Sequence, residues 1–313
     1  MTTTRRWVAK DFGGPEVLEE ISVDLSAPGA GEVTVAVRAC GMNPADYKHF
    51  GPGQDPSLLP LTVGYEVAGA IAVLGPDTEI ASGGGRVGEE VVVFQITDGY
   101  SSAVNAPAGD VFAKPSTLSF PQAANLLLVG TTAAETLHVV GVSAGETLLV
   151  HGAAGAVGTS VVQQARLLGA TVIGTASDRD FEPLVGFGAT PVRYGSGLEE
   201  RVRAAAPNGV DAAIDTVGVD EAIDVSLALV SYRQRIVSTA AFARFKRDGF
   251  QIVGTVNPES GPFRADARPK ILELAAEGKL TVPVGRTFPF GEAPAAVRAL
   301  QGAHPYGKLA LVV

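Results

Sequence analysis

A short run of small residues between Ala153 and Gly158 has the spacing of a nucleotide-binding loop. The run Ala153-x-Gly155-x-x-Gly158 directly follows the apolar segment Thr147–His151 and precedes a helical pattern. Small residues at these positions let backbone N–H groups and a helix N-terminus approach a pyrophosphate closely. A glycine-rich turn can also serve packing alone, but strand, turn and helix follow here in the required order. The sequence therefore predicts dinucleotide binding at this turn.

The end of the next predicted strand indicates which dinucleotide binds. Proteins that bind NAD usually place Asp or Glu there, to hold the ribose 2′-hydroxyl. This strand ends in Thr175, Ala176 and Ser177, and Arg179 follows closely. Ser177 and Arg179 could hold a 2′-phosphate, so the pattern favours NADP. Two alternatives stay open: Arg179 only pairs with a neighbouring aspartate, or Asp178 serves the hydroxyl of NAD.

Composition limits the class of protein and its partners. The chain has 313 residues, 46% of them hydrophobic and 18% charged, which suggests about two domains and excludes wholesale disorder. A formal net charge of −9 does not favour nucleic acid as a partner. The opening residues lack the pattern of a signal peptide, and no apolar run approaches about 18 residues. We therefore expect a cytoplasmic protein with a small-molecule substrate and with neither nucleic acid nor a membrane as partner.

Side chains that could bind a metal are few and scattered. The single cysteine, Cys40, excludes an internal disulfide and a cysteine-rich zinc site. The four histidines, His49, His138, His151 and His304, show no pairing at ligand spacing. The sequence therefore predicts no metal site. We expect His151, beside the glycine turn, to be a packed or hydrogen-bonded residue.

The pattern of predicted secondary structure changes near residue 120. Before it, short apolar segments broken by Gly and Pro indicate an antiparallel, barrel-like β domain. After it, strands and helices alternate, which predicts a parallel sheet covered on both faces. The strands predicted for the first part are Val33–Ala39, Val67–Leu74 and Glu90–Phe94. Those predicted for the second are Thr147–His151, Thr171–Thr175, Val210–Asp215, Arg235–Ser238 and Gln251–Thr255. Helices are expected after Pro44, from Ser119, from a capping box at Thr132–Glu135, and over Val157–Leu168, Phe181–Phe187 and Asp220–Val230. The last predicted elements are an amphipathic helix Pro269–Glu277, a short helix from Ala293 and a closing strand Lys308–Val313.

Five motifs in order give the chain a family resemblance. They are Asn43–Lys48 (NPADYK), Gly64–Gly69 (GYEVAG), Gly130–Ala134 (GTTAA), His151–Gly158 (HGAAGAVG) and Gly307–Val313 (GKLALVV). The sequence resembles the zinc-free quinone oxidoreductase (zeta-crystallin-like) branch of the medium-chain dehydrogenase/reductase superfamily. The resemblance implies an α/β fold in which a GroES-like β-barrel domain (residues 1–120 with 260–313) accompanies a Rossmann domain with a doubly wound parallel sheet (residues 121–259). It also implies that the cofactor lies in the cleft between them.

The sequence differs from the zinc alcohol dehydrogenases of the same superfamily at the positions of their zinc ligands. Those enzymes carry a ligand Cys where this chain has Asn43 and a ligand His where it has Tyr65, and Cys40 lies three residues too early to replace the first. Zinc polarises a carbonyl and stabilises an alkoxide. A quinone or an α,β-unsaturated carbonyl needs less help, because the charge develops as a phenolate or an enolate. The resemblance therefore implies NADPH without zinc, and Tyr65 is expected only to pack beneath the site.

The resemblance also implies roles for single residues, each beside a plainer structural reading. Asn43 matches an asparagine beside the nicotinamide ribose, although Asn-Pro is a common turn opener. Tyr47 could position the acceptor or relay a proton, or it could merely close the cleft. Thr131 and Tyr194 match cofactor contacts, although helix entry and an exposed loop aromatic explain them equally. Lys308 could reach the cofactor from the closing segment, although a lysine that caps a terminal strand is the commoner case. The predicted catalytic residues are Asn43 and Tyr47. The predicted cofactor contacts are Asn43, Thr131, Ala153, Gly155, Ala156, Val157, Gly158, Thr175, Ser177, Arg179, Tyr194, Thr216, Val217, Thr239 and Lys308.

These observations lead to one functional prediction and two alternatives. We expect a metal-free oxidoreductase that transfers hydride from NADPH to a quinone or an α,β-unsaturated carbonyl. The alternatives are an enoyl or 2-alkenal reductase of a biosynthetic pathway and a non-catalytic NADPH-binding protein. The family resemblance also makes Gln251–Thr255 the candidate seam of a homodimer.

Overall fold

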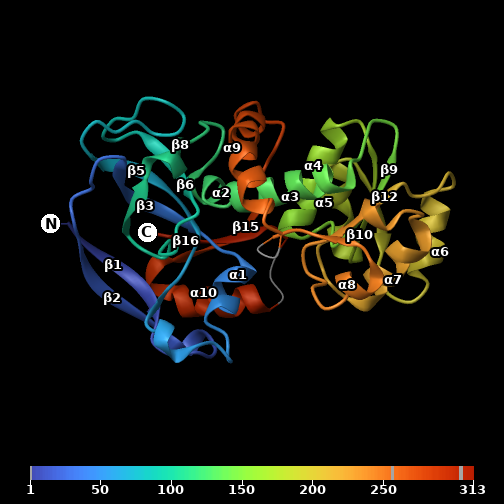
Figure 1. The fold of residues 1–313 in the computed structure, drawn as a ribbon, viewed down its shortest axis with the longest axis horizontal. Coiled ribbons are helices and arrows are strands. Elements are labelled where there is room, and N and C mark those ends of the chain that lie inside the picture. Colours follow the sequence, from blue (N-terminus) through green and yellow to red (C-terminus); the bar gives the residue numbers. More distant parts are fainter. Residues whose placement is uncertain (1, 255–256, 303–305) are drawn as a thin grey trace. The chain divides into compact units, whose positions relative to one another are not determined.

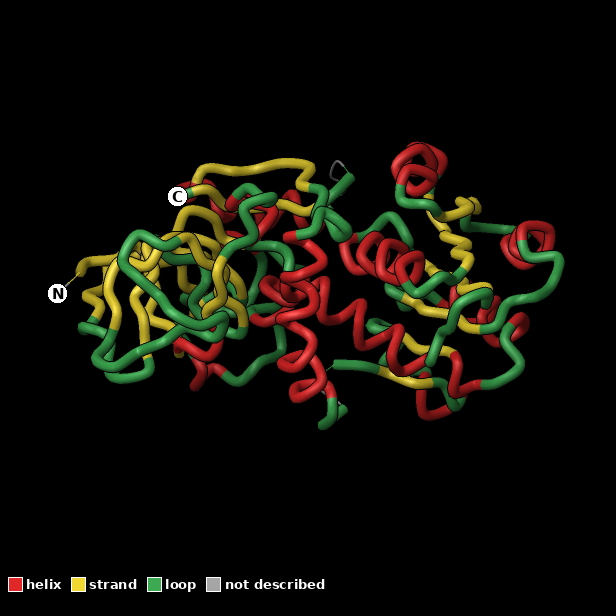
Figure 2. The backbone as a smooth tube through the Cα atoms, turned by 90° about the horizontal axis from the view of Figure 1, so that it is seen from above, coloured by secondary structure: helices red, strands yellow, loops and turns green. Residues whose placement is uncertain are grey.

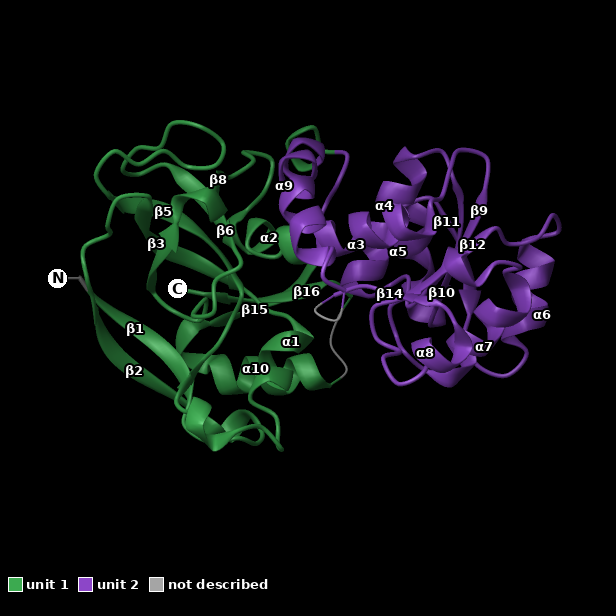
Figure 3. Cartoon of the chain, viewed as in Figure 1, with its two compact units in different colours: residues 1–128, 275–278, 282–313 green, residues 129–274, 279–281 purple. Residues whose placement is uncertain are grey.

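The computed structural model describes residues 2–254, 257–302 and 306–313. The chain forms two compact units (Figure 3). Unit 1 comprises residues 1–128, 275–278 and 282–313, and unit 2 comprises residues 129–274 and 279–281. These bounds differ from the expected boundaries after residues 120 and 259, because the helix that begins at Ser260 packs within unit 2 over most of its length.

Unit 1 is built on antiparallel strands, as the alternation of apolar residues predicts (Figure 1). Within the described residues, its larger sheet has seven strands in the order β15-β16-β3-β5-β6-β8, with β7 also paired to β3. A second sheet has the order β2-β1-β4. The strands are β1 (Thr2–Ala9), β2 (Leu18–Leu25), β3 (Glu32–Gly41), β4 (Leu61–Thr62), β5 (Glu66–Leu74), β6 (Glu90–Phe94), β7 (Ala103–Pro107), β8 (Val111–Ala113), β15 (Val284–Pro289) and β16 (Lys308–Val312). The helices are α1 (Pro44–His49), α2 (Phe120–Ala123) and α10 (Ala293–Gln301).

Unit 2 contains a parallel sheet in the order β11-β10-β9-β12-β13-β14. This order reverses direction beside β9, as in doubly wound sheets that bind dinucleotides, and the fold class expected from the sequence is confirmed. The strands are β9 (Thr147–His151), β10 (Thr171–Ala176), β11 (Ala189–Arg193), β12 (Ala212–Asp215), β13 (Ile236–Ser238) and β14 (Gln251–Ile252). The helices are α3 (Leu127–Val140), α4 (Ala156–Leu167), α5 (Phe181–Gly186), α6 (Leu198–Ala205), α7 (Asp220–Leu229), α8 (Phe245–Asp248) and α9 (Ser260–Ala276).

Both faces of the unit 2 sheet are buried. Leu148 and Val150 of β9 belong to one apolar cluster, with Val161 and Val162 of α4. Leu149, between them, belongs to another, which includes side chains of α6 and α7. Successive strand residues point to opposite faces, so helices must cover both sides, and Figure 2 shows red helices on either side of the yellow strands.

Two sequence expectations about helices are wrong, and several elements were not predicted. Thr132 does not open a helix, because α3 begins at Leu127 and Glu135 instead bonds Ser260 and Arg264 of α9. Pro269 lies inside α9 rather than at its start; contacts such as the stacking of Phe263 on His138 hold the turns before it. The paired strands β1 and β2, the edge strand β11 and the helix α6 were not predicted.

The segment Phe120–Val140 is long and apolar enough by composition to cross a membrane. In the fold, 78% of its most apolar window is buried inside the protein. The core helix of a soluble protein has the same composition, so this feature is weak evidence for a membrane span.

Candidate functional site

The glycine turn between β9 and α4 has no room for a larger residue at Gly152 or Gly158. A Cβ atom added at Gly158 would lie 2.2 Å from the carbonyl oxygen of Gly152. Gly152 has a φ of +70°, and a Cβ there would lie 2.7 Å from Thr216 Oγ1. The helix α4 starts directly after the turn, with Gly155 as its N-cap. The predicted strand, turn and helix are therefore all present, with the geometry that a pyrophosphate requires.

Two of the predicted cofactor contacts support this turn. The backbone N–H of Gly152 donates to Thr175 Oγ1 at 3.1 Å, and that of Ala153 donates to the carbonyl of Thr175 at 3.0 Å. The hydroxyl of Thr216 donates to the carbonyl of His151 at 2.8 Å. These bonds join the turn to the carboxyl ends of β10 and β12, so Thr175 and Thr216 fix its position.

Asp215 organises the loop after β12. Its buried carboxylate accepts hydrogen bonds from the backbone N–H groups of Val217 and Gly218 and from the hydroxyl of Ser238. Its carbonyl also accepts the N–H of the predicted contact Thr239 at 2.9 Å. Sequence reasoning missed Asp215 as a functional residue. An acid at a strand end, followed within three residues by glycine, was the available signal.

A cavity of about 340 Å³ lies at the carboxyl ends of these strands, within unit 2. Of the predicted contacts, six line it: Gly155, Thr175, Ser177, Arg179, Tyr194 and Val217. The lining residues that the sequence did not single out include Leu198, Val219, Glu221 and Ala222, from α6 and the start of α7. The glycine turn, the strand ends and the apolar side chains together suit part of a dinucleotide. Carboxyl ends at a reversal of strand order are where such sheets bind their ligands.

Ser177 and Arg179 both contact Asp180. The Ser177 hydroxyl donates to Asp180 Oδ2, and Arg179 Nε lies 3.5 Å from the same oxygen. The pairing of Arg179 with an aspartate, which the sequence left open, is therefore present. The side chain of Arg179 is nevertheless 68% exposed, so the pair leaves the guanidinium accessible to a ligand.

His151 is a packed residue, as expected. Its ring is buried and its Nε2 lies 3.1 Å from Ser226 Oγ. The Ser226 hydroxyl donates to the carbonyl of Ala222, so Nε2–H of His151 is the donor to Ser226. Burial lowers the pKa of His151 to about 4, and the imidazole is neutral at pH 7.

In unit 1, three other polar residues form a buried cluster. Asn43 Nδ2 donates to Glu66 Oε1 at 2.9 Å, and Lys308 Nζ donates to Asn43 Oδ1 and to the carbonyl of Met42. Lys308 Nζ also lies 3.9 Å from Glu66 Oε1. Burial raises the pKa of Glu66 and lowers that of Lys308, and the attraction between the two charges opposes both shifts. The predicted contacts Asn43 and Lys308 therefore bond to each other inside the unit.

Asp46 and Tyr100 form a second buried pair beside this cluster. Asp46 Oδ2 accepts the Tyr100 hydroxyl at 2.8 Å and the N–H of Asn43 at 2.8 Å, while Asp46 Oδ1 has no hydrogen-bond partner among the residues that the structure describes. Burial raises the pKa of Asp46 to about 7. Burial also raises the pKa of the Cys40 thiol, so this cysteine is protonated and unreactive at pH 7.

The remaining predicted residues take packing positions. Tyr47, proposed as catalytic from the sequence, packs half-buried against the core of unit 1. Tyr65 is half-buried and lies edge-on to His49, with ring centroids 6.2 Å apart. Thr131 is fully buried within α3, four residues after the helix begins.

The unit 1 cluster does not suit zinc. Asn43 stands where the resemblance places one zinc ligand, and the Lys308 ammonium lies against its amide oxygen. A metal cation there would be repelled by that charge. Among residues 2–254, 257–302 and 306–313, no group of three His, Cys, Asp or Glu side chains could hold a metal ion.

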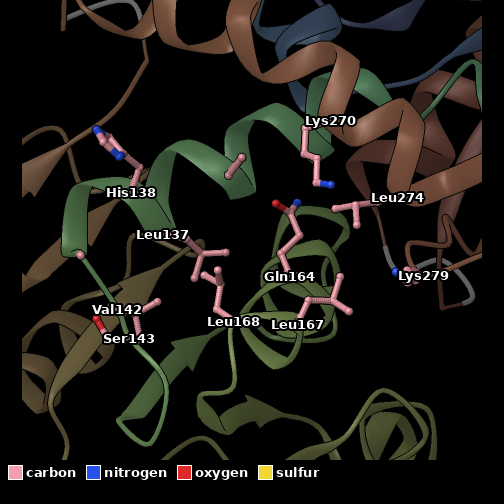
Figure 4. A pocket seen from close by; sticks show the side chains of 12 residues that line it. Leu137, His138, Val142, Ser143, Gln164, Leu167, Leu168, Lys270, Leu274 and Lys279 are labelled. Carbon is pink, nitrogen blue, oxygen red and sulfur yellow. The ribbon is translucent and has the colours of Figure 1, made fainter. Parts of the chain in front are cut away.

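A larger cavity, of about 740 Å³, lies on the side of the unit 2 sheet where its strands begin (Figure 4). Residues just before β9 and at the end of α4 line it, together with parts of α3 and α9. It is therefore separate from the cavity at the carboxyl ends of the strands. Its labelled side chains include Leu137, Leu168, Leu274, Lys270 and Lys279.

Both parts of the chain match known protein families. The alcohol dehydrogenase GroES-like domain family matches residues 29–116, and the zinc-binding dehydrogenase family matches residues 187–311. Quinone oxidoreductase of Sus scrofa is 33% identical over 56% of this chain and 53% of its own length. The spectinabilin polyketide synthase system protein NorB of Streptomyces orinoci is 34% identical over 93% of this chain and 14% of its own length. The chain thus spans about half of the first relative and a small part of the second.

Solved structures resemble the whole chain. An NAD-dependent alcohol dehydrogenase has a TM-score of 0.86 at 26% identity, covering 99% of both chains. Quinone oxidoreductase from Coxiella burnetii has a TM-score of 0.83 at 28% identity, covering 100% of both. The CurK enoyl reductase scores 0.85 at 26% identity over 99% of both. A mycobacterial protein complexed with NADPH scores 0.83 at 26% identity over 99% of this chain and 100% of its own. The chain belongs to the medium-chain dehydrogenase/reductase superfamily, among the relatives of the quinone oxidoreductases.

Proposed function

We propose that the protein is an NADPH-dependent oxidoreductase that delivers hydride to a quinone or an α,β-unsaturated carbonyl. The observation that carries this proposal is the cavity at the carboxyl ends of the unit 2 strands. It combines the glycine turn with a strand end that has no acid at Thr175, Ala176 or Ser177 and has the exposed Arg179 nearby. The NADPH-bound mycobacterial neighbour supports a nicotinamide cofactor.

The chain's own residues divide the work of binding. Backbone N–H groups at the start of α4 bind the pyrophosphate. Thr175 and Thr216 hold the turn, and Asp215 fixes the loop at Val217 and Gly218 by accepting their backbone N–H groups. The bound nicotinamide supplies the hydride.

We further propose that the reaction proceeds without a metal. The Lys308 ammonium beside Asn43 supports this, because it disfavours a second cation there. A quinone or an enone suits such a site, since the charge after hydride addition rests on a phenolate or enolate oxygen. Solvent suffices to protonate a reduced quinone, and Tyr47 is our proposed donor where a side chain is required.

An enoyl reductase acting in a biosynthetic assembly is the second candidate. The match to the polyketide synthase protein over 93% of this chain, and the likeness to CurK enoyl reductase, favour it. The two candidates share the hydride step and differ in the acceptor, which is an enoyl thioester in the second.

A panel of acceptors separates these functions. The purified chain is incubated with NADPH or NADH and with quinones, 2-alkenals and enoyl thioesters, and oxidation of the cofactor is followed at 340 nm. We expect turnover with NADPH and a quinone or enone, and no zinc by elemental analysis. Preference for thioesters would support the second candidate. Binding without turnover on any acceptor would support a non-catalytic protein, and stoichiometric zinc or efficient alcohol oxidation would contradict the proposal.

The assembly is also a proposal. Within the described residues, β14 is an edge strand of the unit 2 sheet, and unpaired edges are templates for pairing with another chain. We propose a homodimer through this edge, of which Thr255 lies outside the described residues. Light scattering that reports a monomer would contradict it.

A further inference from the structure

Arg193 lies where the strands of the unit 2 sheet have their carboxyl ends, beside the loop that follows β10. The strands β10 and β11 are parallel neighbours, and Arg193, the last residue of β11, is in register with Ala176, the last residue of β10. Both strands therefore end at the same point of the sheet. Arg193 directly precedes Tyr194, which lines the nucleotide cavity.

The guanidinium of Arg193 pairs with Asp178, the carboxylate that the sequence offers as a partner for the ribose hydroxyl of NAD. Arg193 Nη1 lies 3.3 Å from Asp178 Oδ2, and the two side chains are 68% and 63% exposed. Exposed pairs of this kind contribute little to stability and exchange partners easily. A phosphate that enters the cavity can therefore take the arginine from Asp178 at little cost.

The backbone that carries Arg193 is held in place. The guanidinium of Arg201 donates to the carbonyls of Arg193, Gly195 and Ser196 at 3.0, 2.7 and 2.8 Å. Glu221, which lines the cavity, accepts the N–H of Gly195 at 2.9 Å. This segment is therefore fixed before any ligand arrives, which lowers the cost of binding.

The acidic side chains near the carboxyl ends of β10 and β11 already have ion-pair or hydrogen-bond partners. Asp178 pairs with Arg193, Asp180 accepts from Ser177 and Arg179, and Glu221 accepts from the Gly195 backbone. The cations Arg179 and Arg193 are both about two-thirds exposed. An arginine fork matches the geometry of a phosphate monoester.

We infer that Arg193 is a specificity-determining residue that binds the adenosine 2′-phosphate together with Arg179 and neutralises Asp178, which would otherwise favour NADH. This inference rests on the proposed NADPH dependence. It adds a residue that the strand-end pattern of β10 does not reveal, because Arg193 belongs to the neighbouring strand.

The test is the R193Q variant, with calorimetric binding of NADPH, NADH and adenosine 2′,5′-bisphosphate. We expect the Kd for NADPH and for the bisphosphate to rise about tenfold, as for loss of one charge-assisted phosphate contact. The Kd for NADH should stay constant or fall, and kcat at saturating NADPH should not change. R193K should recover part of the affinity. The matched control is R203Q, because Arg203 forms a similarly exposed pair with Glu199 on α6 and should leave all three constants unchanged.

A second variant distinguishes direct contact from masking of Asp178. If Arg193 binds the phosphate itself, R193Q weakens NADPH binding in a D178N background as well. An effect that disappears in that background, or an R193Q protein with wild-type NADPH affinity, overturns the inference. A wild-type protein that binds no dinucleotide or prefers NADH overturns instead the proposed NADPH dependence.

Discussion

Lys308 Nζ donates a hydrogen bond to Asn43 Oδ1, although the two residues are 265 positions apart in the sequence. Asn43 in turn donates to Glu66, so an ammonium, an amide and a carboxylate form one buried cluster. This cluster ties the closing strand β16 to the start of α1 and to β5. Asn43 and Lys308, both predicted from the sequence as cofactor contacts, thus have a structural role within unit 1.

Removing the cation should therefore destabilise the protein. K308M leaves the Glu66 carboxylate buried without its partner charge, and breaking such a pair costs about 3–5 kcal/mol. We expect a loss of this size in the free energy of unfolding from denaturant titration. The control is K10M, because Lys10 makes an exposed pair with Glu19 at 3.7 Å and should change stability by less than about 1 kcal/mol. The double variant K308M/E66Q should recover part of the loss; no recovery would show that the pair is not the cause.

Asp46 should make stability fall as the pH rises from about 4 to about 7. Burial raises its pKa from 3.8 to about 7 in the folded state, so the folded protein holds a proton that the unfolded chain has released in this range. The contribution is complete below the unfolded pKa and is lost through the folded pKa, with a slope of up to about 1.4 kcal/mol per pH unit.

The D46N variant measures this contribution, because an amide at this position does not titrate. The difference in unfolding free energy between wild type and D46N should shrink or reverse from pH 4.5 to pH 7.5. Groups that do not interact with Asp46 titrate in both proteins and cancel in the comparison. The exposed variant D24N should track the wild type across the range. A constant wild-type-to-D46N difference would contradict the raised pKa.

The glycine turn offers a pair of variants that separate folding from binding. G158A places a Cβ 2.2 Å from the Gly152 oxygen, so it should lower stability by about 1–3 kcal/mol and weaken NADPH binding. In G155A the new Cβ meets one atom of the described residues within 4 Å, the Gly152 oxygen at 3.2 Å. We expect G155A to weaken binding roughly tenfold, through steric exclusion of the pyrophosphate, with a smaller loss of stability. Equal losses of stability, by thermal unfolding, would be evidence against this division.

Replacing Glu135 should lower the free energy of unfolding by more than the loss of a helix cap does. Its buried carboxylate pairs with Arg264 and accepts the hydroxyl of Ser260, which joins α3 to α9. E135A should cost more than about 2 kcal/mol of unfolding free energy, because it leaves the Arg264 charge without its partner. The control E199A breaks an exposed pair within α6, worth about 0.3–0.5 kcal/mol. A cost for E135A near that of E199A would mean that the α3–α9 pair adds little.

Much of the unit 2 fold follows from local sequence. The apolar run Thr147–His151 and the small residues after it predicted β9, the turn and α4, because each is encoded by neighbouring residues. The edge strand β11 escaped detection because Pro191 interrupts its pattern, and edge strands tolerate proline. The polar helix α6 is anchored by only two fully buried side chains, Leu198 and Val202.

Partners far apart in sequence could not be predicted. The pattern Thr132–Glu135 has the form of a capping box, yet Glu135 pairs with Arg264, 129 residues away. Likewise, nothing near Asp178 in the sequence points to Arg193, which reaches it only because β10 and β11 are neighbours in the sheet.

The sequence by itself determined the fold class, the order of strands and helices around the nucleotide turn, and the family of the chain. These depend on hydrophobic period, turn residues and short motifs, which are local properties. The tertiary structure alone decided which polar groups meet: Lys308 with Asn43, Tyr100 with Asp46, and Arg193 with Asp178. Buried polar groups must find partners, and those partners are set by the pairing of distant strands and helices rather than by neighbouring residues.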